Sequence, residues 1–340
     1  MDNIQYKALV ISEQEGQFYK SIQLLNTEDL PKNEVLIQVY YSSLNYKDAL
    51  SATGNKGVTK NYPHTPGIDA SGIVINSSNE NFITGDKVIV TGNDLGMNTP
   101  GGFGEYIRVP ADWIVKLPVG LSLKEAIIFG TAGFTAGISI KRLIELVNPT
   151  DGKIVVSGAT GGVGSVAISI LNKLGYETVA ITGKTSEFPF LKSLGATEII
   201  QRSEFEVVDK KPIFSAKYAG AIDTVGGTIL ENIVKSLQSL GAVTTCGSVS
   251  GTQLNMSVFP FILRGISLIG ISSQNYPLES RISVWNKLAN EWKPGNLLEL
   301  FTEISLYELE NAIELILQGK LKGRTIINMN PNDEKINREN

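Results

Sequence analysis

The chain has 340 residues, of which 42% are hydrophobic and 19% charged, enough for a sizeable core and for roughly two domains. Its 30 basic and 34 acidic residues give a formal net charge of −4, which offers no electrostatic reason to expect a nucleic acid or a membrane as partner. One Cys and one His exclude an intrachain disulfide and a zinc site built from those residue types, and they fit a reducing, cytoplasmic setting.

The first part of the chain, to about residue 121, has the pattern of a β-rich domain. Strand-forming residues fill 7–12, 35–40 and 87–90. Turn signals bound these segments at 31–33 and 84–86. We therefore predict a domain made mainly of strands.

From about residue 122, short apolar strands alternate with helical segments. The predicted strands lie at 154–157, 178–182, 198–200, 220–223, 241–246 and 266–271, and the predicted helices at 124–144, 163–174, 229–240 and 281–291. Such alternation indicates βαβ units and a doubly wound parallel sheet, so the fold class is α/β. A helix at 306–318 and a strand at 325–328 follow, and the polar residues 330–340 are expected to fray.

The most apolar long stretch, 126–140, does not predict a membrane span. Gly130, Gly133 and Gly137 interrupt it, and it is shorter than the ~20 residues that a transmembrane helix needs. Residues 1–7 also lack the apolar core of a signal peptide. We expect a soluble intracellular protein without a membrane partner.

A glycine-rich turn at 159–164 predicts a dinucleotide site. An apolar strand runs into this turn and then directly into an amphipathic helix, with alanine in place of the first glycine of the G-x-G-x-x-G motif. Gly161 and Gly162 let the backbone approach a pyrophosphate, Gly164 lets helix and sheet pack closely, and the helix N-terminus faces the anion. The alternative is a structural turn that binds nothing.

The end of the next strand indicates which dinucleotide fits. An NAD site places an acidic residue there, about 20 residues after the turn, to bind the ribose 2′-hydroxyl. Here the strand ends in Thr182, Gly183 and Lys184, a hydroxyl and a cation that suit the 2′-phosphate of NADP. Arg202, at the end of the following strand, can reach the same side. NADP(H) is favoured, although Lys184 alone is also compatible with an ordinary solvated lysine.

Six further segments carry recognisable motifs: 42–50 (SSLNYKDAL), 66–72 (PGIDASG), 101–106 (GGFGEY), 110–113 (PADW), 130–136 (GTAGFTA) and 261–264 (FILR). With the glycine-rich turn, they resemble the zinc-free quinone-oxidoreductase branch of the medium-chain dehydrogenase/reductase superfamily. Within that branch the sequence is most similar to the acrylyl-CoA reductase group, and the likeness extends to about Met329.

The resemblance implies a two-domain architecture. A GroES-like catalytic domain would comprise 1–121 and 298–340, a Rossmann NADP-binding domain would comprise 122–297, and catalysis would occur in the cleft. Zinc enzymes of the superfamily carry a Gly-His-Glu segment, and the corresponding stretch here is Gly67-Ile68-Asp69, which holds no His ligand. His64 is expected to be a loop or cleft-wall residue, because a lone His usually is.

The resemblance also implies the contacts of the cofactor. Tyr46 would contact the nicotinamide end, and the loop that contains Ser248 would border it. The remaining assignments are Thr160, Gly161, Gly162 and Val163 for the pyrophosphate and Thr182, Gly183, Lys184 and Arg202 for the adenosine phosphate, with Arg324 assisting. For two residues an alternative stays open: Tyr46 as an ordinary cleft aromatic, and Arg324 as the partner of a carboxylate. Cys246 is not expected to be a nucleophile, because its apolar surroundings keep the thiol protonated.

The absence of a metal favours reduction of a C=C bond conjugated to a carbonyl over alcohol oxidation, since zinc stabilises the alkoxide in the latter. Hydride from NADPH would go to the β-carbon, and backbone N–H groups, Asn45 and Tyr46 are candidate donors to the enolate oxygen. Solvent or Tyr46 would protonate the α-carbon. For a coenzyme A ester, Lys56, Lys60 and Arg108 are possible phosphate partners, or simply solvated charges.

The sequence therefore predicts an NADPH-dependent, metal-independent reductase of an activated C=C bond or a quinone, with an enone, a quinone or a short enoyl-CoA such as acrylyl-CoA as substrate. It does not choose among these acceptors. An NADPH-binding sensor or RNA-binding protein without catalysis is the alternative, and a zinc alcohol dehydrogenase is opposed by the ligand count. The apolar strand 266–271 predicts a homodimer through edge-to-edge pairing.

Overall fold

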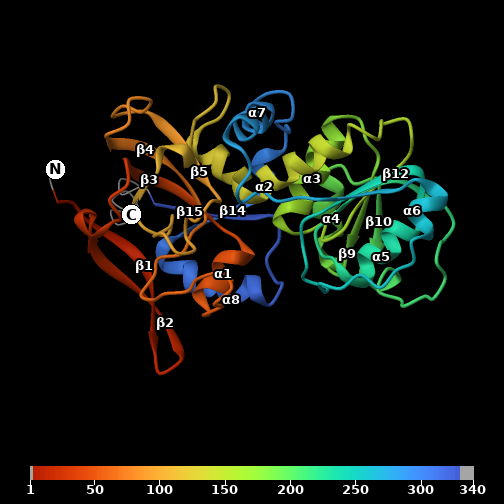
Figure 1. Cartoon of the computed structure of the whole chain (residues 1–340), viewed down its shortest axis with the longest axis horizontal. Helices are drawn as coiled ribbons and strands as arrows, with labels where there is room; N and C mark the ends of the chain where they lie inside the picture. The colour runs from red at the N-terminus through yellow and green to blue at the C-terminus, as the bar shows by residue number, and fades with distance from the viewer. Residues whose placement is uncertain (1–2, 330–340) are drawn as a thin grey trace. The chain divides into compact units, whose positions relative to one another are not determined.

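The computed structural model describes residues 3–329, which fold into two compact units (Figure 1). The first, here called the β-rich unit, comprises residues 3–131, 274–289 and 301–329. The second, the Rossmann unit, comprises Ala132–Ser273 and Asn290–Leu300.

The β-rich unit is organised around a seven-stranded sheet. Its strand order is β14-β15-β3-β4-β5-β7, and β6 pairs with β3. These strands are β3 (Val35–Leu44), β4 (Asp69–Ser77), β5 (Lys87–Thr91), β6 (Tyr106–Val109), β7 (Ile114–Lys116), β14 (Phe301–Ser305) and β15 (Arg324–Asn328). Alternate residues of β3 point into the core, where Val35, Ile37 and Val39 are fully buried. Helices α1 (Tyr46–Ala52), α7 (Leu278–Ala289) and α8 (Leu309–Leu317) complete the unit.

A separate hairpin precedes this sheet. Strands β1 (Gln5–Gln14) and β2 (Gln17–Asn26) pair antiparallel over their whole length. Glu15 and Gly16 connect them, and both have positive φ, at 51° and 78°. A two-residue loop with both central residues left-handed matches the right-handed twist of the strands, which fixes the register of the hairpin.

The Rossmann unit contains a six-stranded parallel sheet in the order β10-β9-β8-β11-β12-β13. The strands are β8 (Ile154–Val156), β9 (Thr178–Thr182), β10 (Glu198–Gln201), β11 (Tyr218–Asp223), β12 (Leu237–Thr245) and β13 (Ser267–Gly270). In chain order this is 3-2-1-4-5-6, with the reversal between β8 and β11, where doubly wound folds bind nucleotides. The helices are α3 (Gly162–Lys173), α4 (Phe188–Ser193), α5 (Gly227–Lys235) and α6 (Phe259–Arg264). The predicted α/β fold class, with a β-rich part and a doubly wound parallel sheet, is confirmed.

Helix α2 (Leu123–Leu143) is longer than the apolar stretch 126–140 seen in the sequence. Its backbone leaves the helical conformation at Gly130, where φ is 51° and ψ is −157°. By length and composition this helix is apolar enough to cross a membrane, but 78% of the relevant window is buried inside the structure, as expected for a core helix.

The predicted domain bounds differ from the observed units. Residues 122–131 and the segment Gln274–Ala289 lie in the β-rich unit, whereas 298–300 lie in the Rossmann unit. The reason for the second difference is Arg281, a buried residue of α7 whose guanidinium donates to both the carbonyl and the hydroxyl of Thr91, at 2.6 and 3.0 Å. This buried contact ties α7 to the end of β5.

The largest error in the predicted elements concerns 229–240, which we expected to be one helix. Helix α5 ends at Lys235, and β12 begins at Leu237, which pairs with Tyr218 of β11. Leu240 adopts a positive φ of 63°, so the segment bends within the strand. The apolar residues of 229–240 fit both the helical period and the strand period, and pairing with β11 makes the last part of the segment a strand. The predicted fraying of 330–340 lies outside the described residues.

Candidate active site

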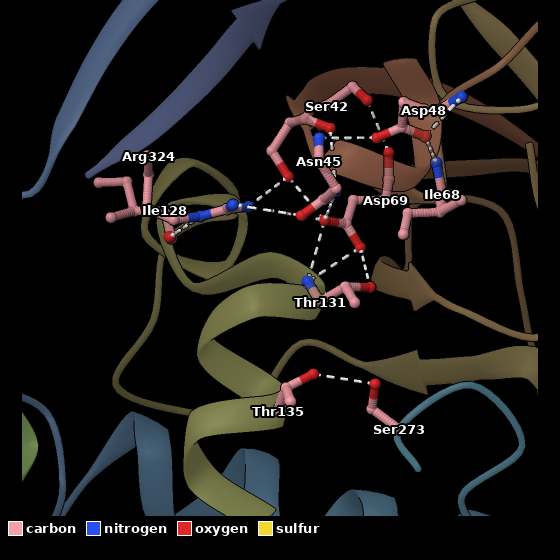
Figure 2. A network of polar contacts seen from close by, with 12 residues as sticks. Ser42, Asn45, Asp48, Ile68, Asp69, Ile128, Thr131, Thr135, Ser273 and Arg324 are labelled. Carbon is pink, nitrogen blue, oxygen red and sulfur yellow. Dashed lines mark hydrogen bonds and ion pairs between the residues drawn. The ribbon is translucent and has the colours of Figure 1, made fainter. Parts of the chain in front are cut away.

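A fully buried carboxylate lies at the start of β4. Asp69 accepts hydrogen bonds from the Ser43 hydroxyl at 2.6 Å and from the Asn45 amide at 2.8 Å (Figure 2). The backbone N–H and the hydroxyl of Thr131 donate to it from the first half of α2. The network therefore joins β3, α1, β4 and α2 within the β-rich unit.

Arg324 supplies the positive charge of this network. Its guanidinium lies 3.7 Å from an oxygen of Asp69 and donates to the Ser43 hydroxyl at 2.7 Å. It also donates to the Ile128 carbonyl and to the side-chain oxygen of Asn45. Burial lowers the pKa of Arg324, and the charge of Asp69 opposes that shift. A buried ion pair of this kind persists because every polar atom has a partner.

This position corrects the predicted role of Arg324 at the adenosine phosphate. The residue is 2% exposed, and all three guanidinium nitrogens donate inside the network. Reaching a phosphate would strand Asp69 as an unpaired buried charge, which is costly. The alternative from the sequence, that Arg324 pairs with a carboxylate, describes the structure.

Gly130 permits the network to lie against α2. A Cβ atom at this position would be 2.6 Å from Asp69 Oδ2, 2.7 Å from an Arg324 nitrogen and 2.8 Å from Ser43 Oγ. Its positive φ is also a conformation that side chains avoid. The break in the helix is therefore a requirement of the buried ion pair.

A second buried carboxylate, Asp48, holds the start of α1. It accepts hydrogen bonds from the backbone N–H groups of Asn45, Gly67 and Ile68 at 2.7–3.1 Å. Burial and the nearby charge of Asp69 raise its pKa to about 7, although these hydrogen bonds oppose the shift. Asp48 can therefore exchange a proton near neutral pH.

The two predicted catalytic residues, Asn45 and Tyr46, differ in what they can offer a substrate. The Asn45 amide nitrogen already donates to Asp69 and to the Ser43 carbonyl, so both of its hydrogens are used. Tyr46 is the first residue of α1 and is 42% exposed. Asn45 thus positions the start of the helix, whereas Tyr46 lies partly in solvent.

In the Rossmann unit, glycines leave the backbone without side chains where α3 begins. A Cβ atom at Gly164 would be 2.5 Å from the Gly158 carbonyl oxygen, so helix and strand need glycine there. At Gly161 the nearest obstacle is the same oxygen, at 3.2 Å, and the other side is open. The first N–H groups of α3, at Gly162 and Val163, have no acceptor within the helix and are suited to an anion.

At the switch point, Asp223, the last residue of β11, links the carboxyl ends of the neighbouring strands. Its carboxylate accepts from the Ser157 hydroxyl at 2.7 Å, after β8, and from the Thr245 hydroxyl at 2.9 Å, at the end of β12. The N–H of Gly226 donates to it as well. Burial raises the pKa of Asp223, and these hydrogen bonds oppose the shift.

The residues predicted for the adenosine phosphate lie together at the ends of β9 and β10. Thr182 pairs in register with Gln201, so the residues that follow each strand are neighbours. A Cβ atom at Gly183 would be 3.4 Å from the Arg202 guanidinium, which therefore packs over the bare backbone of Gly183. Thr182 accepts a hydrogen bond from the N–H of Lys184, and burial lowers the pKa of the Lys184 ammonium.

The remaining sequence candidates are placed as follows. Ser248 is exposed in the loop after β12. Burial and the charge of Asp223 raise the pKa of Cys246 to about 12, so its thiol is protonated at neutral pH. His64 is buried, and its backbone pairs with Ile11. Among residues 3–329, no group of three or more His, Cys, Asp or Glu side chains is arranged to hold a metal.

Comparison with known proteins places this fold in a family. Residues 31–119 match the alcohol dehydrogenase GroES-like domain, and residues 162–290 match the zinc-binding dehydrogenase model. YhfP of Bacillus subtilis (strain 168), a candidate quinone oxidoreductase by name, is 42% identical over 95% of this chain and 99% of its own. The chain belongs to the quinone-oxidoreductase branch of the medium-chain dehydrogenase/reductase superfamily.

Two further members of this superfamily bear on its chemistry. The acrylyl-CoA reductase AcuI of Ruegeria pomeroyi is 39% identical over 96% of this chain and 99% of its own. The crystal structure of Escherichia coli K-12 YhdH, with NADPH bound, superposes with a TM-score of 0.92 at 41% identity over 95% of this chain and all of that one. The structure of YhfP, with NAD bound, gives a TM-score of 0.93 over 96% of this chain and 99% of its own.

The sequence alone did not reveal the buried network. Ser43, Asp48 and Thr131 were not singled out, although all lie within the motif segments 42–50 and 130–136. The available signal was an acidic residue between apolar ones, as Asp69 lies between Ile68 and Ala70, since a carboxylate is rarely buried unless it is paired.

Proposed function

We propose that the protein is an NADP(H)-dependent reductase that adds hydride to an activated C=C bond or a quinone. The observation that carries this proposal is the exposed glycine backbone at the carboxyl ends of the Rossmann strands, with Lys184 and Arg202 beside it. The chain is also 39–42% identical over its length to an acrylyl-CoA reductase and a candidate quinone oxidoreductase. That similarity supports a reductase rather than an NADPH sensor or an RNA-binding protein.

The described residues fit NADP. Gly162 and Val163, the first residues of α3, offer N–H donors for the pyrophosphate, and Thr160 and Gly161 form the turn that leads to them. Tyr46 and Ser248 would lie toward the nicotinamide end. That YhdH was crystallised with NADPH supports the same cofactor here.

The 2′-phosphate of the adenosine would be held after β9 and β10. Lys184 and Arg202 supply two cations beside Gly183, and Thr182 supplies a hydroxyl. Arg202 also pairs with Glu206 at 3.0 Å, an exposed contact that a phosphate can replace at little cost. YhfP was crystallised with NAD, so the preference must be measured for this chain.

The chemistry follows from these placements. Bound NADPH would supply a hydride to the β-carbon of the acceptor; the C=C electron pair would then form the Cα=C bond of an enolate, and the carbonyl electrons would move onto oxygen. Asp69 and Arg324 fix Asn45 and thereby the start of α1, which carries the hydroxyl of the partly exposed Tyr46. That hydroxyl or solvent returns a proton to the α-carbon.

We propose that this reaction needs no metal. The chain has one Cys and one His, and structural and catalytic zinc sites use three or four protein ligands drawn mainly from these types. Metal analysis of the active enzyme tests the point, because a stoichiometric zinc ion lost together with activity on chelation would contradict it.

The acceptor is a small conjugated carbonyl, a quinone or a short enoyl-CoA. For a coenzyme A ester, Lys60 and Arg108 remain candidate phosphate partners, whereas Lys56 is paired with Glu13 at 2.6 Å. Side-by-side turnover of acrylyl-CoA, an enone and a benzoquinone, with NADPH and with NADH, tests the function. We expect NADPH oxidation with at least one acceptor; inactivity with all of them contradicts the proposal.

We also propose a cytoplasmic homodimer. Strand β13 ends the sheet and pairs there with β12, and the neighbouring α6 exposes Phe259, Ile262 and Leu263 by 44–67%. An apolar face beside an open strand edge is suited to pairing with a second copy. Light scattering should give a dimer, and Leu263→Glu should give a monomer. The matched variant Val119→Glu, at another exposed apolar residue, should remain dimeric.

A further inference from the structure

The Rossmann unit has a cavity, lined entirely by its own residues, at the amino-terminal ends of its strands. Its volume is about 860 Å³, within the range of roughly 300–1,000 Å³ that small-molecule sites occupy. The polar residues that line it stand at or just before the starts of β8, β9, β10 and β11, or at the end of η4 (Arg202–Glu204): Lys153, Glu177, Glu198, Glu204, Lys217 and Tyr218. The nucleotide edge lies at the opposite, carboxyl ends of β8, β11 and β12, so this cavity is separate from the dinucleotide site.

Tyr218 brings a polar group without a partner to this cavity. The residue is 6% exposed, and its ring packs against that of Phe205 with the ring centres 6.4 Å apart. Its hydroxyl has no hydrogen-bond partner among residues 3–329, but it is not fully covered, unlike the hydroxyl of Thr178. Tyr176, the other tyrosine of this unit, donates to the Val147 carbonyl at 2.8 Å. Because a buried tyrosine hydroxyl usually has a partner, the Tyr218 hydroxyl indicates a ligand that reaches it through the cavity.

The charges around this hydroxyl favour a cationic ligand. Three glutamates and two lysines line the cavity, and the Lys153 ammonium is already paired with Glu198 at 2.9 Å. Glu204 has no ion-pair partner in the described part of the chain. Burial raises the pKa of Tyr218, and the nearby charges of Glu198 and Glu204 raise it further. The hydroxyl is therefore protonated and neutral, with lone pairs that can accept a hydrogen bond.

An aliphatic ammonium fits these surroundings better than a metal ion. Among residues 3–329, no group of three or more His, Cys, Asp or Glu side chains is arranged around one point, and the glutamates of the cavity stand on separate segments. A neutral phenol accepts a hydrogen bond from an ammonium N–H, whereas the metals that bind carboxylates take oxygen ligands in sets. Ile199 and Ile200, half-buried residues of β10 in the cavity wall, offer an apolar surface to a methylene chain.

We propose that this cavity binds an aliphatic amine, whose ammonium donates hydrogen bonds to Tyr218 Oη and to the Glu204 carboxylate. The methylene chain of the ligand packs against Ile199 and Ile200, and the pair between Lys153 and Glu198 stays intact beside it. The inference is independent of the proposed function, because neither the cofactor nor the acceptor takes part in this binding.

Putrescine, a four-carbon diamine, is the probe. Calorimetric titration of the whole chain at low ionic strength should give a Kd of about 1 mM or lower, whereas 1,4-butanediol and succinate, which have similar length but no cation, should not bind. Tyr218→Phe and Glu204→Gln should each weaken putrescine binding about tenfold, because each removes one hydrogen bond to the charged group. Glu299→Gln, at an exposed glutamate that does not line the cavity, is the control and should bind like the wild type.

Stability and cofactor binding separate this role of Tyr218 from a structural one. Because the hydroxyl has no partner to lose, Tyr218→Phe should leave the urea midpoint unchanged while it weakens putrescine binding. Its NADPH affinity should also stay within about twofold of the wild type, since the nucleotide edge lies at the other end of the strands. The proposal is overturned if the wild type binds no putrescine up to about 10 mM, or if the wild type and both variants bind it equally.

Discussion

The two units differ in whether their polar groups are satisfied by hydrogen bonds within the protein. In the β-rich unit, Asp69 and Arg324 are withdrawn from water and satisfied by each other and by neighbouring side chains and backbone. In the Rossmann unit, the start of α3 leaves its N–H groups open, and Lys184 and Arg202 stay partly in solvent. The first arrangement fixes geometry, whereas the second leaves binding capacity for a ligand. Substitutions in the two units should therefore affect different quantities.

The largest expected effect is on the stability of the β-rich unit. Arg324→Met leaves the buried Asp69 charge without its partner and should lower the free energy of unfolding by about 3–5 kcal/mol. Urea denaturation measures it. Lys153→Met breaks an exposed pair with Glu198 in the Rossmann unit and should cost about 0–1 kcal/mol. Similar losses in the two variants would contradict the contrast between the units.

A pH dependence should identify Asp48. Its folded pKa of about 7 lies above the unfolded value near ~3.9, so the folded state holds the extra proton between these values. The contribution of Asp48 to stability is therefore fully present below about pH 4 and is lost as the pH rises through about 7. The Asp48→Asn variant has no titrating group at this position, so its free energy of unfolding relative to that of the wild type should rise between about pH 4 and about pH 7. A constant difference between the two proteins from pH 4 to 8 would show that Asp48 does not titrate there.

The smallest effect should be confined to ligand binding in the Rossmann unit. Lys184→Ala should weaken NADPH about tenfold or more without changing the affinity for NADH, because a charge-assisted hydrogen bond contributes about 1.5–3 kcal/mol. Calorimetric titration measures both affinities, and Lys192→Ala, an exposed lysine of α4, is the control. Equal weakening of the two cofactors would place Lys184 away from the 2′-phosphate.

The same contrast explains what the sequence could predict. Strand β9 was predicted with its observed bounds, Thr178–Thr182, because a continuous apolar run between turn signals specifies a buried parallel strand. The cluster around Gly183 followed from residues only a few positions beyond two adjacent strands. Both predictions depended on local pattern and on the fixed geometry of parallel sheets.

The buried network could not be read in that way. Asp69 and Arg324 are separated by more than two hundred positions, and their approach depends on β15 pairing with β3 and on the break at Gly130. The family resemblance placed Arg324 at the phosphate, since the Gly-Arg-Thr motif does not reveal that this arginine is buried. The sequence also did not reveal that the Asn45 amide hydrogens donate to the Asp69 carboxylate and to the carbonyl of Ser43.

The hydrogen bonds at Asp223 have a further consequence for the nucleotide edge. Because this carboxylate already links the ends of β8, β11 and β12, little backbone freedom remains to be lost there when a dinucleotide binds. Association should then carry a small conformational-entropy penalty at this edge. The amide of Gly226 should exchange with deuterium slowly even without cofactor, and cofactor should change that rate little. We therefore expect the carboxyl ends of these strands to be ordered before the dinucleotide binds.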